Sequence, residues 1–167
     1  GAETPEGRVA SWRVNATAVG YLTKVAIQND ITLVHISSDY VFDGAKDNHT
    51  EDEPLSPLSV YGASKACGDA ILGLAPKHYL LRTSWVIGEG NNFVRTMAGL
   101  AQKDISPTVV HDQVGRLTFT NELVRAIDHL LTNNHAYGTY NVSNSGESAS
   151  WADITRQIFK VLGRDDL

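Results

Sequence analysis

The sequence lacks several features that would each assign it to a class of protein. Its 167 residues contain one cysteine, Cys67, which excludes an internal disulfide. No apolar run approaches the ~18 residues of a membrane-spanning helix, so no membrane association is expected. Acidic residues outnumber basic ones by 19 to 14, and the net charge of −5 argues against a nucleic-acid partner. The six histidines show no metal-ligand spacing, and we expect no metal site.

The N-terminus also lacks a targeting pattern. Residues 1–9 (GAETPEGRV) have neither the basic start nor the apolar core of a signal peptide, so we expect a cytoplasmic protein. A complete glycine-rich dinucleotide fingerprint is absent as well. Gly88-Glu89-Gly90 lacks the third glycine and is interpreted as a turn.

The chain is organised around the stretch 31–65. Residues 31–36 form a short β-branched apolar run, which predicts a buried strand. Ser37 and Ser38 follow directly, so two hydroxyls stand at the carboxyl end of that strand. Open α/β sheets bind their ligands at this end.

Tyr61 and Lys65 stand four apart in a predicted helix and therefore share one face. A free tyrosine has a pKa of ~10, and a nearby cation favours its phenolate. With Ser38 to bind the same oxygen, this set suits proton transfer to a carbonyl while a hydride reaches its carbon. A lone Tyr-x-x-x-Lys is more often a solvated pair, and serines at strand ends often only satisfy the backbone. Serines at a strand end followed by Tyr-x-x-x-Lys are together far more specific for a catalytic site than either signal alone.

Apolar periodicity predicts the other elements of an α/β fold. The expected helices are 8–28, 58–74, 93–102, 120–131 and one that opens at 150; the further strands are 78–87, 108–111 and 138–142. In the first helix the expected buried positions are Trp12, Val19, Leu22, Val25 and Ala26. The alternation favours an incomplete doubly wound, Rossmann-like parallel sheet.

Four segments resemble the short-chain dehydrogenase/reductase superfamily, in its extended, nucleotide-sugar-modifying branch. They are SSDYVFDG from residue 37, EDEPLSPLSVYGASK from 51, RTSWVIGEGNNFV from 82 and DQVGRLTFT from 112. The resemblance covers nearly the whole chain. Ser38 falls where that branch usually has threonine, which preserves the hydroxyl.

The resemblance implies a role for each matching residue. Tyr61 would be the acid, Lys65 would tune it and hold the cofactor ribose, and Ser38 would orient the carbonyl. The implied cofactor is NADPH or NADH, with contacts from Ser37, Ser38, Tyr61, Lys65, Thr83 and Ser84. The implied substrate is a dTDP-sugar, with contacts from Asp39, Tyr40, Trp85, Asn91, Asn92, Gln113 and Arg116. From its position alone, Trp85 is equally consistent with a core residue.

The implied reaction is reduction of the 4-keto group of dTDP-4-dehydro-6-deoxy-L-mannose to dTDP-L-rhamnose. A related nucleotide-sugar epimerase or dehydratase is an alternative. A non-catalytic regulatory subunit of the methionine adenosyltransferase type, which carries a similar SSDYVFDG, is another. Trp85 and the DQVGR loop favour the reductase.

The same resemblance predicts a fragment. The superfamily begins with a strand, a glycine-rich turn and a helix that hold the cofactor pyrophosphate, and this chain shows no such turn. Residues 1–88 would be the latter part of the dinucleotide-binding domain, and 89–167 mainly substrate-binding segments interleaved with the sheet. We expect weak dinucleotide binding by this chain alone. An open sheet edge also predicts self-association, such as a homodimer.

Overall fold

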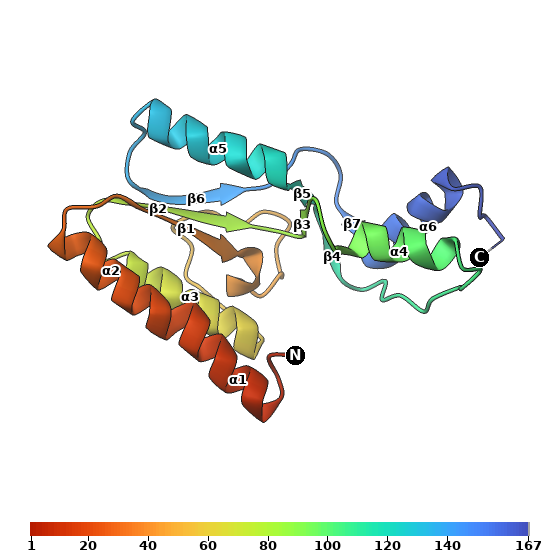
Figure 1. Cartoon of the computed structure of the whole chain (residues 1–167), viewed down its shortest axis with the longest axis horizontal. Coiled ribbons are helices and arrows are strands. Elements are labelled where there is room, and N and C mark those ends of the chain that lie inside the picture. Colours follow the sequence, from red (N-terminus) through yellow and green to blue (C-terminus); the bar gives the residue numbers. More distant parts are fainter. Residues whose placement is uncertain (167) are drawn as a thin grey trace. The chain divides into compact units, whose positions relative to one another are not determined.

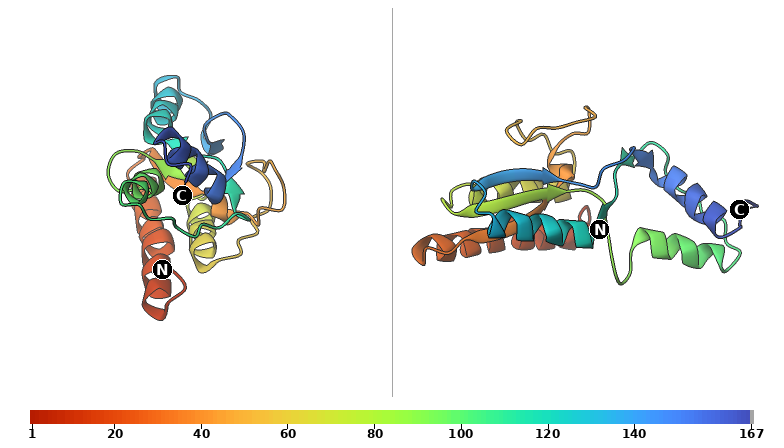
Figure 2. Two further views of the ribbon diagram at one scale, coloured as in Figure 1. Left: turned by 90° about the vertical axis from the view of Figure 1, so that its right-hand side faces the viewer. Right: turned by 90° about the horizontal axis from the view of Figure 1, so that it is seen from above.

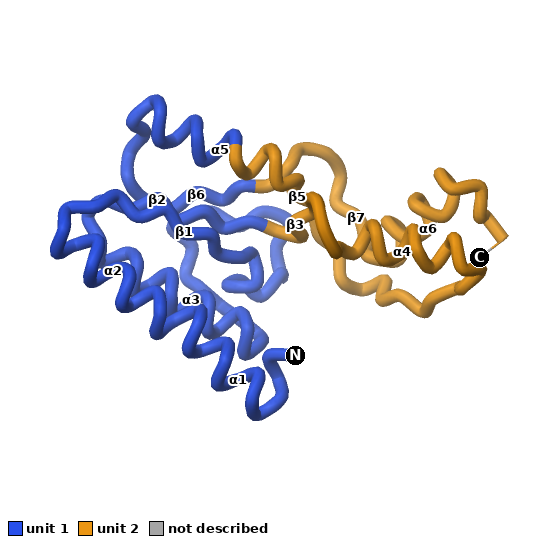
Figure 3. The backbone as a smooth tube through the Cα atoms, viewed as in Figure 1, with its two compact units in different colours: residues 1–83, 125–142 blue, residues 84–124, 143–167 orange. Residues whose placement is uncertain are grey.

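The structure, a computed structural model, describes residues 1–166 (Figure 1). The chain forms two compact units (Figure 3). Unit 1 comprises residues 1–83 and 125–142, and unit 2 comprises residues 84–124 and 143–167.

Unit 1 is built on a three-stranded parallel sheet in the order β1-β2-β6. The strands are β1 (Leu33–Ser38), β2 (His78–Thr83) and β6 (Gly138–Val142). The helices are α1 (Pro5–Trp12), η1 (Arg13–Thr17), α2 (Ala18–Gln28), η2 (Asp39–Val41), α3 (Val60–Leu72) and, from Arg125 onward, α5 (Thr120–Thr132), whose first residues belong to unit 2. The predicted α/β fold with a parallel sheet is therefore confirmed.

The helices of unit 1 cover both faces of this sheet. The continuous rod α1-η1-α2 and the helix α3 lie together on one face, and α5 lies on the other (Figures 1 and 2). The core between α2, α3 and the sheet contains Val19, Leu72 and Leu80, with Leu33 packed against them. This layering leaves the carboxyl ends of the strands free to carry polar side chains.

The N-terminal helix is longer and less buried than predicted. It starts at Pro5, with Thr4 as N-cap, and contains a π-helical turn at η1. Val19 and Ala26 are buried as expected. The prediction was wrong for Trp12, Leu22 and Val25, which are 42%, 54% and 50% exposed. The face of α2 that carries the small residues Val19, Thr23 and Ala26 is buried, and α2 packs on α3. The larger apolar residues of α2 therefore face away from the described core.

Unit 2 contains two helices and four short strands. They are β3 (Val86–Ile87), α4 (Phe93–Ala101), β4 (Val114–Gly115), β5 (Thr118–Phe119), β7 (Ala149–Ser150) and α6 (Trp151–Val161). Strand β3 pairs with β5 in parallel, and β4 pairs with β7 antiparallel. Met97, Ala101 and Phe159 form the core where α4 and α6 pack.

The ends of both helices in unit 2 follow sequence signals. Asn92 caps α4 through a bond from the Arg95 amide, and Ser150 and Asp153 form the expected capping box of α6. The predicted strand 108–111 was wrong. That stretch has no paired strand among residues 1–166, although the Ala152 amide donates to the Val110 carbonyl. Within the described chain, no helix combines the length and the apolar character needed to cross a membrane.

Candidate active site

Ser38 lies at the end of β1, where the strand turns into the short helix η2. Its hydroxyl accepts a hydrogen bond from the Tyr40 amide at 3.2 Å and donates one to Asp39 Oδ1 at 3.1 Å. Burial raises the pKa of the Asp39 carboxyl, and the bond from Ser38 partly opposes that rise. The strand extends two residues beyond the predicted 31–36, so Ser37 and Ser38 belong to the strand itself.

Tyr61 lies in the first turn of α3, close to the carboxyl end of β1. Ser59 caps this helix by accepting from the Gly62 amide at 3.0 Å. A Cβ on Gly62 would collide with the Tyr40 carbonyl, so glycine is required for α3 to pack this closely on η2. The rings of Tyr40 and Tyr61 meet edge to face, 5.9 Å between centroids. Sequence spacing therefore placed Tyr61 correctly, beside the residues that follow Ser38.

The environment of Tyr61 keeps its hydroxyl protonated in this chain. Burial raises its pKa, and the nearby Ser38 hydroxyl opposes the rise. The sequence led us to expect that Lys65 would lower the pKa of Tyr61. The Lys65 ammonium instead donates to the Ile36 carbonyl at 2.6 Å, and the burial effect on Tyr61 wins. A phenol held in its neutral form can serve as a proton donor.

Lys65 lies one turn after Tyr61 and is only 9% exposed. Burial lowers the pKa of its ammonium, and the carboxylate of Asp69 opposes that shift. Across from it on β1, burial and then the Lys65 charge lower the pKa of His35 to about 4. At neutral pH the lysine is therefore the cation of this pair, and the imidazole is neutral.

A buried ion pair stands behind Lys65, and sequence reasoning missed it. Arg82 Nε donates to Asp69 Oδ2 at 3.0 Å, and both side chains are almost fully buried. Two signals were available. Asp69 follows Lys65 by four residues, and Arg82 is the lone cation in the apolar run of β2.

Asn15 contributes to the placement of α3. Its side-chain amide donates to Ser64 Oγ at 3.0 Å, and Ser64 in turn donates to the Tyr61 carbonyl at 2.7 Å. A Cβ on Gly68 would collide with the Asn15 carbonyl, so the π-helical turn and α3 are in close contact. Such π-turns are frequent at functional sites.

Two buried hydroxyls lie at the strand ends of unit 1. Thr83 Oγ1 has no hydrogen-bond partner within the described chain. Ser37 Oγ makes no hydrogen bond of good geometry there, but it lies close enough to the Asp69 carboxyl to lower its pKa. A buried polar atom without a partner is costly unless a ligand or water satisfies it. The carboxyl ends of β1 and β2 therefore fit a polar ligand such as the implied dinucleotide.

The other predicted site residues belong to unit 2, and several of them are structural there. Trp85 has a positive φ of 38° and stacks on Trp151 with 3.6 Å between ring centroids. Ser84 Oγ donates to the Arg116 carbonyl at 2.7 Å. Arg116 Nε is buried without a partner in the described residues. Each of these groups shapes the loops that carry β3, β4 and β5.

Of the remaining three predicted residues, Asn92 is a helix cap, and Asn91 and Gln113 are exposed. Asn92 donates to the Gly88 carbonyl at 2.7 Å while it caps α4, so its side chain is fully used locally. Trp151, the stacking partner of Trp85, was not among the predicted residues, and no spacing in the sequence indicates it.

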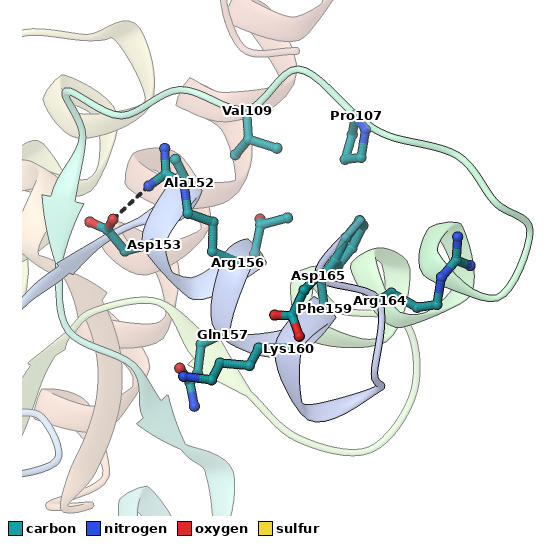
Figure 4. Close-up of a pocket in the computed structure, with 11 residues that line it drawn as sticks. Pro107, Val109, Ala152, Asp153, Arg156, Gln157, Phe159, Lys160, Arg164 and Asp165 are labelled. Atoms are coloured by element: carbon teal, nitrogen blue, oxygen red, sulfur yellow. Dashed lines mark hydrogen bonds and ion pairs between the residues drawn. The ribbon is translucent and has the colours of Figure 1, made fainter. Parts of the chain in front are cut away.

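Unit 2 also contains a cavity of about 440 Å³ between α6 and residues 107–109 (Figure 4). Phe159, Ala152 and Thr155 lie among its lining residues, with Arg156 and Lys160 beside them. None of the predicted site residues lines it. Within residues 1–166 no group of three or more acidic, histidine or cysteine side chains has a metal-binding arrangement.

Comparison with known proteins identifies relatives along the whole chain. Residues 1–166 match the model of the RmlD substrate binding domain. The dTDP-4-dehydrorhamnose reductase of Mycolicibacterium smegmatis is 40% identical over 158 residues, 91% of this chain and 48% of that protein. The dTDP-4-dehydrorhamnose reductase of Aggregatibacter actinomycetemcomitans is 39% identical, over 90% of this chain and 53% of its own.

A solved structure gives the same relationship in three dimensions. The dTDP-4-dehydrorhamnose reductase of Bacillus anthracis, in complex with NADP, superposes with a TM-score of 0.87 at 36% identity. The match covers 97% of this chain and 57% of that one. The chain thus spans about half the length of the relatives it matches. On this evidence the chain belongs to the RmlD substrate binding domain family.

Proposed function

We propose that this chain carries the catalytic residues of an NAD(P)H-dependent reductase acting on the 4-keto group of a dTDP-linked 6-deoxysugar. The specific reaction proposed is the conversion of dTDP-4-dehydro-6-deoxy-L-mannose to dTDP-L-rhamnose. The observation that carries the proposal is the cluster at the end of β1. Ser38, a protonated Tyr61 and a buried, charged Lys65 come together there in a chain whose relatives are named as such reductases.

The residues of unit 1 divide the chemistry between them. Tyr61 donates a proton to the oxygen of the reacting carbonyl, because a tyrosine hydroxyl is protonated at neutral pH and this one lies beside Ser38. Ser38 binds the same oxygen and fixes its position. The Lys65 ammonium provides positive charge beside the developing alkoxide, which is stabilised most as its charge grows.

The same end of the sheet accommodates the cofactor. The nicotinamide supplies the hydride when it is bound. The Thr83 hydroxyl is a buried donor without a partner in the described residues, and it could satisfy a polar atom of the cofactor; the Ser37 hydroxyl lies beside the Asp69 carboxyl. We propose that Ser84, Trp85, Asn91, Gln113 and Arg116 of unit 2 contribute to cofactor and sugar binding, and that Asn92, whose side chain caps α4, contributes by fixing the turn that carries Asn91.

A chimera tests the proposal directly. Residues 1–166 would replace the matching half of the M. smegmatis reductase, so that the rest of that protein completes the enzyme. NADPH consumption is then followed by absorbance with the dTDP-4-keto-6-deoxysugar as substrate. Circular dichroism and NADPH titration establish that the chimera is folded and binds cofactor.

We expect turnover that depends on both the dTDP-sugar and NADPH. A folded, NADPH-binding chimera without turnover would contradict the reductase proposal and favour a non-catalytic role. Product analysis separates the remaining alternatives, because a dehydratase or an epimerase would convert a nucleotide sugar with no net consumption of NADPH.

We also propose that the chain self-associates through the open side of β1. β1 pairs with β2 on one edge only, and no other strand of residues 1–166 covers its second edge. Leu22 and Val25 of α2, and Ile31 just before β1, are each about half exposed. An unpaired strand edge beside apolar surface is a template for pairing.

A further inference from the structure

Helix α3 carries three titratable side chains on one face. Tyr61, Lys65 and Asp69 are spaced four apart, and α3 packs on both β1 and β2. Exposure falls along the row, from 36% at Tyr61 to 9% at Lys65 and 4% at Asp69. Lysine and aspartate are rarely this buried unless they are paired. The last two members of the row therefore require a partner for their charges.

Lys65 has no carboxylate at ion-pair distance within residues 1–166. Its ammonium donates to the Ile36 carbonyl, which offers only a partial negative charge. The Asp69 carboxylate, one turn further along α3, supplies a full negative charge that raises the pKa of the Lys65 ammonium. A charge one helical turn away acts strongly here, because the surroundings are largely closed to water.

The position of Asp69 is set from outside the helix. Arg82 of β2 binds its Oδ2. Burial raises the pKa of the Asp69 carboxyl, and the Ser37 hydroxyl, Arg82 and the Lys65 charge oppose that rise. Arg82 is itself fixed by the Glu51 carbonyl at 3.0 Å and by the Phe42 ring, 5.2 Å from its guanidinium carbon. The carboxylate is thus held by β2 and by the loop that follows η2, and it cannot turn toward solvent.

We propose that Asp69 is a positioning residue, whose carboxylate, clamped by Arg82, keeps the Lys65 ammonium charged and seated against β1. The inference deepens the proposed function, on which it rests, by naming the residue that keeps the Lys65 ammonium charged and in position. Without this carboxylate the buried ammonium would lose the one full counter-charge that acts on it among residues 1–166. It would release its proton more readily and leave the Ile36 carbonyl more often.

The other groups around Lys65 do not replace Asp69. Tyr61 of α3 is neutral, because its pKa is raised. His35 of β1 has a pKa of about 4 and is uncharged at neutral pH. Arg82 of β2 is a cation, so its own charge cannot serve as a counter-charge for the lysine; it contributes by holding the Asp69 carboxylate in place. Asp69 is therefore the group whose removal should change Lys65.

Direct titration of Lys65 tests the inference without any assay of turnover. The 167-residue chain, labelled with carbon-13 at the lysine side chains, is titrated by NMR, and the Lys65 signal is identified by its loss in Lys65→Arg. We expect the pKa of Lys65 to fall in Asp69→Asn and to stay near the wild-type value in Asp69→Glu. The matched control is Asp30→Asn, which removes the carboxylate from an exposed pair with Lys77. It should leave Lys65 unchanged.

A second variant covers the case in which Asp69→Asn does not fold, because it leaves the buried Arg82 unpaired. The double variant Asp69→Asn, Arg82→Gln removes both charges and leaves no orphaned ion. Because the loss of the Arg82 cation partly offsets the loss of the carboxylate, the pKa of Lys65 should fall by less than in Asp69→Asn. An unchanged Lys65 titration in folded Asp69→Asn, or in the double variant where Asp69→Asn does not fold, overturns the inference. Turnover of the chimera addresses the proposed function separately, so the two can fail independently.

Discussion

β1 and β2 are adjacent strands of six residues each, paired one to one, and they differ in almost every other respect. In β2 all residues after His78 are buried, including Leu80 and Leu81. In β1 only Ser37 is buried, and the others are partly exposed. β2 is the centre of the described sheet and β1 is its edge.

The difference indicates a division of labour within one sheet. The side chains of β2 fill the core, apart from Arg82, which fixes Asp69. β1 contributes less to the core but carries His35 beside Lys65, and Ser38 at its end. A strand at an edge can present polar groups without leaving them in a dry core, where an unpaired one would be costly.

The comparison predicts that the same substitution has unequal effects in the two strands. Leu81→Ala in β2, where the side chain is fully buried, should lower the free energy of unfolding by about 2–5 kcal/mol. Leu33→Ala in β1 should cost less, about 1–2 kcal/mol, because that side chain is already partly exposed. Urea unfolding of the two variants measures the difference. Equal losses would show that β1 is as buried in solution as β2.

A second prediction concerns chemistry at the end of β1. In the chimera, Ser38→Ala should raise the activation free energy that kcat/KM reports by roughly 1–3 kcal/mol. This is the cost of leaving a charged oxygen without its hydrogen-bond partner. Ser38→Thr keeps the hydroxyl and should be nearly silent. Steady-state kinetics with saturating NADPH provides the measurement. If both variants are as active as the parent chimera, Ser38 is no more than a cap for η2.

A third prediction uses the open edge of β1. Analytical ultracentrifugation at increasing concentration should show dimers or larger species, and Val25→Lys should shift the chain toward monomer. Val161→Lys is the matched control, because Val161 of α6 in unit 2 is 75% exposed. It should leave the association unchanged. A wild-type chain that stays monomeric would remove the edge from consideration as an interface.

A further prediction is a pH dependence of the free energy of unfolding that comes from His35 of β1. Its pKa is about 4 in the folded chain, below the ordinary ~6.5 of an unfolded histidine. The unfolded state therefore binds the proton first. The stability contribution is complete above about pH 6.5 and is lost as the pH falls toward 4.

Thermal unfolding across this pH range reports the His35 contribution. His35→Gln should flatten the decline, and His111→Gln, at an exposed histidine, should not. Identical slopes for all three proteins would show that His35 titrates normally.

The sequence predicted the parts of this molecule that depend on local pattern. The strand before Ser38, the helix of Tyr61 and Lys65, and the capping box of α6 follow from periodicity and short spacings, which report neighbours along the chain. The order of these elements was enough to indicate an α/β fold and the three catalytic candidates.

The parts that failed depend on what packs against an element. Leu22 and Val25 belong to an apolar helix, but no described element covers their side of it. Residues 108–110 are β-branched, yet no strand of the described residues pairs with them. The pair of Asp69 and Arg82 joins a helix to a strand, and no spacing rule anticipates which distant cation a carboxylate will meet.

The most direct test is the effect of Tyr61→Phe on the chimera, with kcat and the NADPH Kd measured on the same preparation. The phenolic oxygen acts as the carbonyl gains charge, so its loss removes transition-state stabilisation and leaves ground-state binding nearly intact. We predict a kcat lowered by roughly 10²–10⁴-fold with a nearly unchanged Kd, the range of a general acid. A variant that keeps more than about a tenth of the parent kcat, well short of that loss, would show that Tyr61 is not the proton donor.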